Sequence, residues 1–264
     1  MTTGGGHPAP SAAVLRAFGV GESVPAPLAG GRGLTWRAGD VVLRPHDGAA
    51  LTDWRAAVLD GLDHGAGFRT PRPVRARDGG WRVGAWEAWE WLPGAADESR
   101  VEDVVRAGDA FHGAIAHLQR PAFLDLADDA WGRADRMVWD EAPMVPVPGA
   151  ERLVAAFRPV RGPSQLVHGD LLGNVLFADG SPPAVIDWPP YWRPAGLGAA
   201  IAAVDAVCWH GYPLDGVDAL GAGVDDWRQL LVRALAFRVV TLHLLGGWGR
   251  AAQEHHRAVV DALA

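Results

Sequence analysis

The sequence contains no lysine, because all 24 of its basic residues are arginine. No site in this chain can therefore use a lysine ammonium group to hold an anion. Cysteine is almost as scarce, since Cys208 is the single cysteine among 264 residues. One cysteine cannot form a disulfide within the chain, which excludes a disulfide-stabilised scaffold and is typical of a protein from a reducing compartment.

Long apolar runs are also missing. No stretch approaches the ~20 residues that an α-helix needs to span a bilayer, so we expect no membrane partner. Residues 1–10 contain neither the basic nor the apolar segment of a signal peptide, and we expect them to be disordered and the protein to be cytoplasmic. The net charge of −7 argues against nucleic acid as a partner and is compatible with cationic small substrates.

The most informative part of the sequence is residues 166–188. Two short apolar runs, 175–177 and 184–186, flank a segment rich in turn-forming residues, which predicts an antiparallel hairpin. Asn174 precedes the first run and Asp187 follows the second, so we expect the two residues to lie opposite each other. Their side-chain oxygens suit Mg²⁺, which usually takes one or two protein ligands and completes its shell with water and phosphate.

Asp170 lies four residues before Asn174, in the loop that enters the hairpin. A carboxylate at this position can orient a hydroxyl nucleophile, or accept its proton, beside the metal. A base, a metal ligand, a hairpin and a second metal ligand, in this order, are typical of a kinase catalytic loop. The sequence therefore predicts Asp170 as the catalytic residue and Asn174 and Asp187 as metal ligands.

His168-Gly169-Asp170 with Asn174, followed by Val185-Ile186-Asp187-Trp188, resembles the aminoglycoside phosphotransferase and choline kinase-like family of small-molecule kinases. The resemblance implies an α+β, two-lobed protein-kinase-like fold, with a small antiparallel β N-terminal lobe and a larger helical C-terminal lobe. It also implies ATP and Mg²⁺ as cofactors, a small-molecule acceptor, and a structural role for His168. The interval from Asp170 to Asn174 is one residue shorter than is usual in the family.

The pattern of the chain changes at Gly94. Before it, short β-type segments at 34–37, 41–44, 74–76 and 81–91 accompany helices predicted over 11–18 and 51–62. After it, helices are predicted over 101–118, 131–139, 197–209, 227–245 and 255–263. We expect a nucleotide-binding lobe over 1–93 and a helical lobe with the catalytic loop and acceptor site over 94–264.

Arg44 stands where the family has its phosphate-holding lysine. Arginine keeps the charge and can bind phosphate through two nitrogens, although a solvated strand arginine with a packed stem would look the same. The helix that follows offers Asp53 as the acidic partner of Arg44. Asp53 equally suits a role without Arg44, because a carboxylate near the start of a helix stabilises the helix N-terminus.

Four further residues are candidates for binding the nucleotide. Gly31 and Gly33 belong to a glycine-rich turn that either drapes backbone N–H groups over phosphates or forms a plain hairpin turn. Glu90 and Trp91 lie in the segment 89–94, which resembles the hinge of the family and would bind adenine through backbone groups.

The sequence leaves other interpretations open. The missing lysine and the short loop also fit a nucleotide-binding pseudokinase, and His168, Asp170 and Asp187 could serve a metal-dependent hydrolase. Trp139, Trp188 and Trp192 are either an aromatic wall for the acceptor or core residues. Asp205 lies inside an apolar helix, where we expect it to anchor helices through a buried partner. Neither the acceptor nor the oligomeric state can be inferred.

Overall fold

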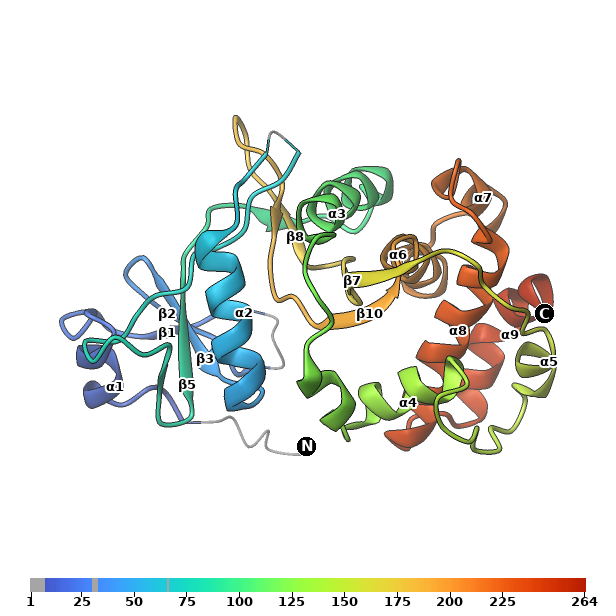
Figure 1. Cartoon of the computed structure of the whole chain (residues 1–264), viewed down its shortest axis with the longest axis horizontal. Coiled ribbons are helices and arrows are strands. Elements are labelled where there is room, and N and C mark those ends of the chain that lie inside the picture. The colour runs from blue at the N-terminus through green and yellow to red at the C-terminus, as the bar shows by residue number, and fades with distance from the viewer. Residues whose placement is uncertain (1–7, 30–32, 66) are drawn as a thin grey trace. The chain divides into compact units, whose positions relative to one another are not determined.

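The structure is a computed structural model that describes residues 8–29, 33–65 and 67–264. The chain forms two compact units. Unit 1 comprises Met1–His64 and Arg69–Gly94, and unit 2 comprises Gly65–Phe68 and Ala95–Ala264. Unit 1 contains an antiparallel sheet with two helices, whereas helices dominate unit 2 (Figure 1). The predicted α+β class is thus confirmed.

Unit 1 is organised around a five-stranded antiparallel sheet with the order β1-β2-β3-β5-β4. Its strands are β1 (Ala26–Pro27), β2 (Trp36–Ala38), β3 (Val41–Pro45), β4 (Arg82–Val83) and β5 (Trp86–Glu90). β3 pairs with β5 over its whole length, from Val41 opposite Glu90 to Pro45 opposite Trp86. This register puts Arg44 directly opposite Glu87.

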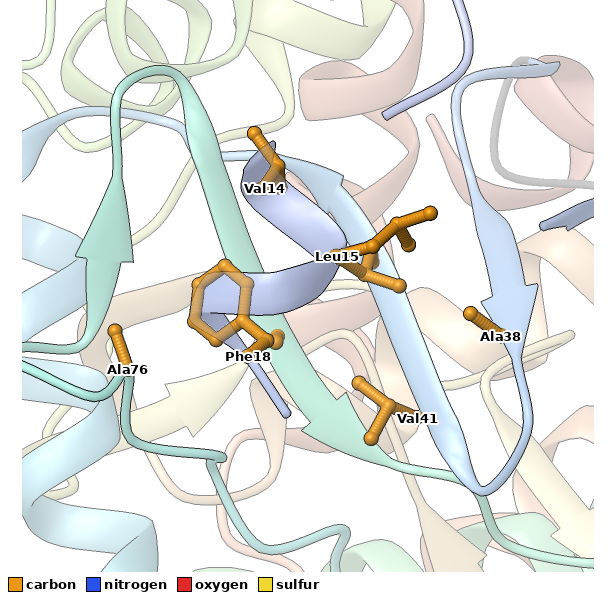
Figure 2. Packing of buried hydrophobic residues seen from close by; sticks show 8 residues of the cluster. Val14, Leu15, Phe18, Ala38, Val41 and Ala76 are labelled. Atoms are coloured by element: carbon orange, nitrogen blue, oxygen red, sulfur yellow. The ribbon is translucent and has the colours of Figure 1, made fainter. Parts of the chain in front are cut away.

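The two helices of unit 1 cover opposite faces of this sheet (Figure 1). In α1 (Ala12–Ala17), Ser11 caps the first turn by accepting a hydrogen bond from the Val14 amide. Figure 2 shows the apolar cluster on the α1 side, formed by Val14, Leu15, Phe18, Ala38, Val41, Leu43, Ala76 and Ala88. Side chains alternate along a strand, so Arg44 projects to the other face, where α2 (Ala49–Gly61) lies.

The segment 81–91 forms two strands, whereas one strand was predicted. Gly84, with φ +58°, turns the chain between β4 and β5, a conformation that glycine adopts without steric cost. The predicted strand at 74–76 is wrong, since no strand forms there. The described structure has only an isolated bridge beside it, Pro73 to Trp89, with the Val74 amide donating to the Ala88 carbonyl (2.8 Å). The ladder goes no further because β4 pairs with the next residues of β5 and the Ala76 amide donates to the Gly80 carbonyl.

The described part of unit 2 contains the five helices expected after Gly94, together with two short helices, Glu151–Ala155 and Val217–Leu220, that were not predicted. They are α3 (Val101–Ile115), α4 (Ala130–Val138), α5 (Glu151–Ala155), α6 (Leu197–Trp209), α7 (Val217–Leu220), α8 (Trp227–Leu244) and α9 (Arg250–Leu263), with 3-10 turns at Ala122–Leu126 and Leu214–Gly216. α6 is buried on nearly all sides, and α8 packs against both α4 and α6 (Figure 1). No helix among the described residues has the length and apolarity to cross a membrane.

The strands of unit 2 frame the catalytic segment. β7 (Ser164–His168) pairs with β10 (Pro190–Pro194), and β6 (Ala95–Ala96), β8 (Val175–Phe177) and β9 (Ala184–Val185) form a three-stranded sheet in the order β6-β8-β9. The predicted β8–β9 hairpin is confirmed, but its register is not. Val175 pairs with Val185, so Asn174 lies opposite Ile186 and not opposite Asp187, because β9 ends one residue earlier than predicted.

Candidate active site

His168, at the end of β7, holds the catalytic loop to the hairpin. Its buried ring accepts a hydrogen bond at Nδ1 from the Asp170 amide (3.0 Å). Since an amide N–H can only donate, the ring proton is on Nε2, which donates to the Ile186 carbonyl (2.9 Å). The predicted structural role of His168, hydrogen bonding to the backbone near the catalytic loop, is therefore confirmed.

His112 of α3 supports the same strand and was not singled out from the sequence. Its Nε2 accepts a hydrogen bond from the His168 amide (2.9 Å). Burial, with a smaller effect from His168, lowers the pKa of His112 to about 3. A Cβ on Gly198 of α6 would lie 2.5 Å from the His112 ring, so the close packing of α3 and α6 requires glycine there.

Asp170 is held at both carboxylate oxygens. Oδ1 accepts a hydrogen bond from Nη2 of Arg238 (2.7 Å), and Oδ2 accepts one from Nδ2 of Asn174 (3.2 Å). The same Asn174 nitrogen donates to the Asp170 carbonyl (2.7 Å). The side chain is half exposed, so it is oriented by the protein and still accessible to a ligand.

Arg238 of α8 is a further residue that sequence analysis missed. It lies 68 positions after Asp170 and also binds Asp205 of α6 in a bidentate pair, Nε to Oδ1 at 2.8 Å and Nη2 to Oδ2 at 2.5 Å. Burial opposes its charge, but Asp205 and Asp170 outweigh that effect and raise the pKa of Arg238. The predicted anchoring role of Asp205 is confirmed. An arginine inside an apolar helix was the available signal, since a buried cation needs a carboxylate.

Asn174 and Asp187 offer oxygen donors at the end of the hairpin. Because Nδ2 of Asn174 is bound to Asp170, its Oδ1 atom is the one that faces away from that contact. Asp187 is exposed and has a left-handed backbone, φ +49°, which is uncommon outside glycine. The described residues contain no group of three or more His, Cys, Asp or Glu side chains that could hold a metal ion. Two oxygen donors fit Mg²⁺, which does not require an all-protein cage.

Unit 1 contains a buried ion-pair cluster around Arg44. Glu87 accepts hydrogen bonds from Nε of Arg44 (2.6 Å) and from Nη2 of Arg55, which is 2.8 Å from Oε1 and 3.2 Å from Oε2. Burial raises the pKa of Glu87, but Arg55 and then Arg44 outweigh that effect and lower it below its usual range. The half-exposed Asp47 lies farther away, at 3.6 Å from Arg55.

The carboxylate bound to Arg44 thus comes from β5, whereas the expected partner was Asp53 of the following helix. Asp53 forms a bidentate pair with Arg82 at 2.9 and 3.0 Å, and this contact lowers the pKa of Asp53. The sheet register explains the difference, because it puts Arg44 and Glu87 side by side on the same face.

The remaining nucleotide candidates are only partly described. Gly33 has φ +72°, which fits a tight turn, and Gly31 lies outside the described residues. The amide of Glu90 donates to the Arg72 carbonyl and that of Trp91 to the Asp40 carbonyl, both at 2.8 Å. These two donors are therefore already engaged within unit 1.

The aromatic residues first considered for the acceptor belong to the packing of unit 2. Trp188 is buried, donates to the Val167 carbonyl and packs edge-on against Phe111. Trp139 lies against the guanidinium of Arg233, and Trp192 is a half-buried residue of β10.

A cavity of about 300 Å³ adjoins Asp170 within unit 2. It is lined by Trp131, Asp170, Leu172, Asp205, Trp209, His210, Arg238, Thr241, Leu242 and Leu245. A volume of this size is at the lower end of small-molecule sites. Neither Trp131 nor Trp209 had been considered for this role, since their proximity depends on how α4 and α6 pack against α8.

A comparison with protein-family models identifies the family of this chain. The family model described as "Phosphotransferase enzyme family" matches residues 26–191. No curated protein matches the sequence.

Solved structures resemble the whole chain. An aminoglycoside phosphotransferase from Alicyclobacillus acidocaldarius has 17% identity and a TM-score of 0.55, and the match covers 97% of this chain and 96% of that one. A microcompartment-associated aminopropanol kinase has 16% identity and a TM-score of 0.58, with 96% and 94% covered. An aminoglycoside phosphotransferase in a ternary complex with AMP-PNP and hygromycin B has 15% identity and a TM-score of 0.56, with 92% and 95% covered. At these identities the likeness shows the fold, which is the protein-kinase-like fold predicted above.

Proposed function

This chain belongs to the phosphotransferase enzyme family, and we propose that it is a small-molecule kinase. It transfers the terminal phosphoryl group of ATP, with Mg²⁺, to a hydroxyl group of a small molecule. The observation that carries the proposal is the carboxylate of Asp170. It is held by Arg238 on one oxygen and by Asn174 on the other, and it lines a cavity large enough for an acceptor.

Asp170 acts on the acceptor. Phosphoryl transfer needs little covalent chemistry from the protein, so positioning and charge neutralisation provide most of the rate. The acceptor hydroxyl donates its hydrogen bond to Asp170, and its oxygen attacks the terminal phosphorus. The bond from that phosphorus to the bridging oxygen breaks, ADP leaves, and the hydroxyl proton goes to Asp170. Arg238 is a positioning residue in this scheme.

Asn174, through Oδ1, and Asp187 would hold Mg²⁺. When bound, the cation neutralises charge on the phosphate oxygens. The hydrogen bonds of Asn174 to Asp170 support this role, since they keep the ligand beside the base despite the short loop.

Arg44 would hold the nucleotide phosphates in place of the usual lysine. Its contact with Glu87 supports this role, because it holds the guanidinium in one orientation, and a guanidinium suits the geometry of a phosphate group. The turn with Gly31 and Gly33, and the segment with Glu90 and Trp91, would bind phosphate and adenine. For Glu90 and Trp91, backbone carbonyl groups are the atoms we assign, since the amides are engaged.

The test is the substitution Asp170→Asn, with ADP release measured over a panel of amino-alcohols and sugars. We expect transfer to fall about 10²- to 10⁴-fold, the range of general-base contributions, while ATP affinity stays within a few-fold. Asp179→Asn, an exposed aspartate in the hairpin turn, is the matched control and should keep full activity. Unchanged turnover in Asp170→Asn would reject the catalytic role, and a wild-type protein that binds ATP without transferring it would be a pseudokinase.

A further inference from the structure

The cavity beside Asp170 has little charge to offer a ligand. Its two carboxylates, Asp170 and Asp205, are both bound to the same guanidinium, that of Arg238. Two negative groups and one positive group leave a net charge of −1 in this part of the wall. An acceptor with several ammonium groups would need several carboxylates to compensate for their loss of water.

The rest of the wall is mainly apolar. It is formed by the side chains of Trp131, Leu172, Trp209, Leu242 and Leu245, with His210 and Thr241. Trp209 is 44% exposed and Leu245 is 53% exposed. They are two of the four large hydrophobic side chains that are exposed among the described residues, and both line this cavity. Exposed apolar side chains gathered at a concave site are typical of ligand binding.

We infer that the acceptor is a small alcohol with an apolar or aromatic body and at most one positive charge. Its hydroxyl lies at Asp170, its body packs against Trp209 and Leu245, and one ammonium group balances the net charge of −1. The inference rests on the proposed phosphotransferase function. It deepens that function by naming the chemical class that the cavity selects.

A series of amino-alcohols with one reacting head tests the inference. Alaninol, leucinol and phenylalaninol differ only in the size of the apolar body, and hygromycin B serves as a polycationic acceptor. We expect kcat/KM to rise about 10- to 100-fold from alaninol to phenylalaninol, as burial of an aromatic side chain predicts, and hygromycin B to be the poorest acceptor. A kcat/KM that stays constant or falls from alaninol to phenylalaninol, or a preference for hygromycin B, overturns the inference.

Direct binding separates failure of the inference from failure of the proposed function. Dissociation constants for the same series, measured by calorimetry without ATP, should show the same order, because the apolar wall acts without catalysis. If this order is found but no alcohol is phosphorylated, the proposed function fails and the inferred ligand class stands. If alcohols are phosphorylated but the affinities are flat, the inference fails and the function stands.

Variants at the apolar wall complete the test. Leu245→Asp adds a charge where the side chain is already exposed, and we expect it to remove most of the preference for phenylalaninol and to improve hygromycin B. Trp209→Ala should reduce the preference without favouring the polycation. Leu126→Asp is the matched control, since Leu126 is 80% exposed and is not part of the cavity wall. If the Leu245→Asp protein keeps the wild-type order of kcat/KM over the four acceptors, the inference is contradicted.

Discussion

The two units contain ion-pair clusters of opposite composition. In unit 1, two cations share one anion, Arg44 and Arg55 around Glu87. In unit 2, two anions share one cation, Asp170 and Asp205 around Arg238. Each cluster therefore has a central charge that two outer charges of opposite sign share, and the outer charges are positive in unit 1, where the half-exposed Asp47 lies 3.6 Å from Arg55, and negative in unit 2.

The outer members differ in exposure in the same way. The Arg44 side chain is 16% exposed and that of Arg55 is 2% exposed, while Asp170 is 48% exposed and Asp205 is 9% exposed. In each cluster one outer member is thus more exposed than the other, which is buried with the central charge. This difference agrees with the proposal that Arg44 and Asp170 bind ligands, while Arg55 and Asp205 hold the central charge in place.

Removing the central charge of unit 2 should have the largest effect. Arg238→Met leaves Asp205 buried without its partner, which should lower the free energy of unfolding by about 3–5 kcal/mol. The double variant Arg238→Met, Asp205→Leu removes both charges and should regain much of that stability. If Arg238 positions Asp170, the double variant should still lose about 10²-fold in kcat although its stability is largely restored. Recovery of kcat together with stability would mean that Arg238 is only structural.

In unit 1, the comparison predicts that the more exposed arginine binds phosphate. Arg44→Met should weaken ATP binding about 10- to 150-fold, since a charge-assisted contact contributes about 1.5–3 kcal/mol, and should leave adenosine binding nearly unchanged. Arg44→Lys should restore part of the loss. Arg55→Met is the matched variant and should weaken ATP and adenosine to a similar degree, through the fold of the unit. Equal losses in Arg44→Met would contradict the assignment of Arg44.

The catalytic loop of unit 2 should also be sensitive to acid through His112. Its pKa is about 3 in the folded protein and 6.5 when unperturbed. Between these values the unfolded chain binds one more proton, so the free energy of unfolding falls as the pH drops, by up to about 1.4 kcal/mol per pH unit. We expect a loss of about 2 kcal/mol from pH 6.5 to pH 5 in chemical denaturation.

The matching variants isolate this histidine. His112→Gln should flatten the pH dependence, because glutamine has no proton to gain, while His117→Gln, at an exposed position, should leave it as in the wild type. An equally steep dependence in His112→Gln would assign the acid sensitivity to other groups.

The smallest effect is expected at Asp53, which lies outside both clusters. Its pair with Arg82 is largely exposed, and such pairs contribute less than about 1 kcal/mol. Asp53→Ala should therefore leave ATP affinity and unfolding within error of the wild type. A clear loss of ATP affinity would restore Asp53 as a nucleotide-binding residue.

Local patterns predicted most elements, because they depend on residues close in sequence. The helices α3, α4, α6 and α8 follow from apolar periodicity, and the β8–β9 hairpin from two apolar runs around a turn. β10 was not predicted, since it begins and ends with proline and shows no strand pattern of its own. It forms a strand because each of its five residues pairs with a residue of β7.

The sequence by itself determined the catalytic loop candidates, Asp170, Asn174 and Asp187, since their order and spacing are local. Only the tertiary structure decided which charges they meet. Glu87 reaches Arg44 through the register of β3 and β5, and Arg238 reaches Asp170 through the packing of α8 against α6. Sequence periodicity indicates which face of an element is apolar, but the partner that a buried charge finds across two elements depends on how those elements pack.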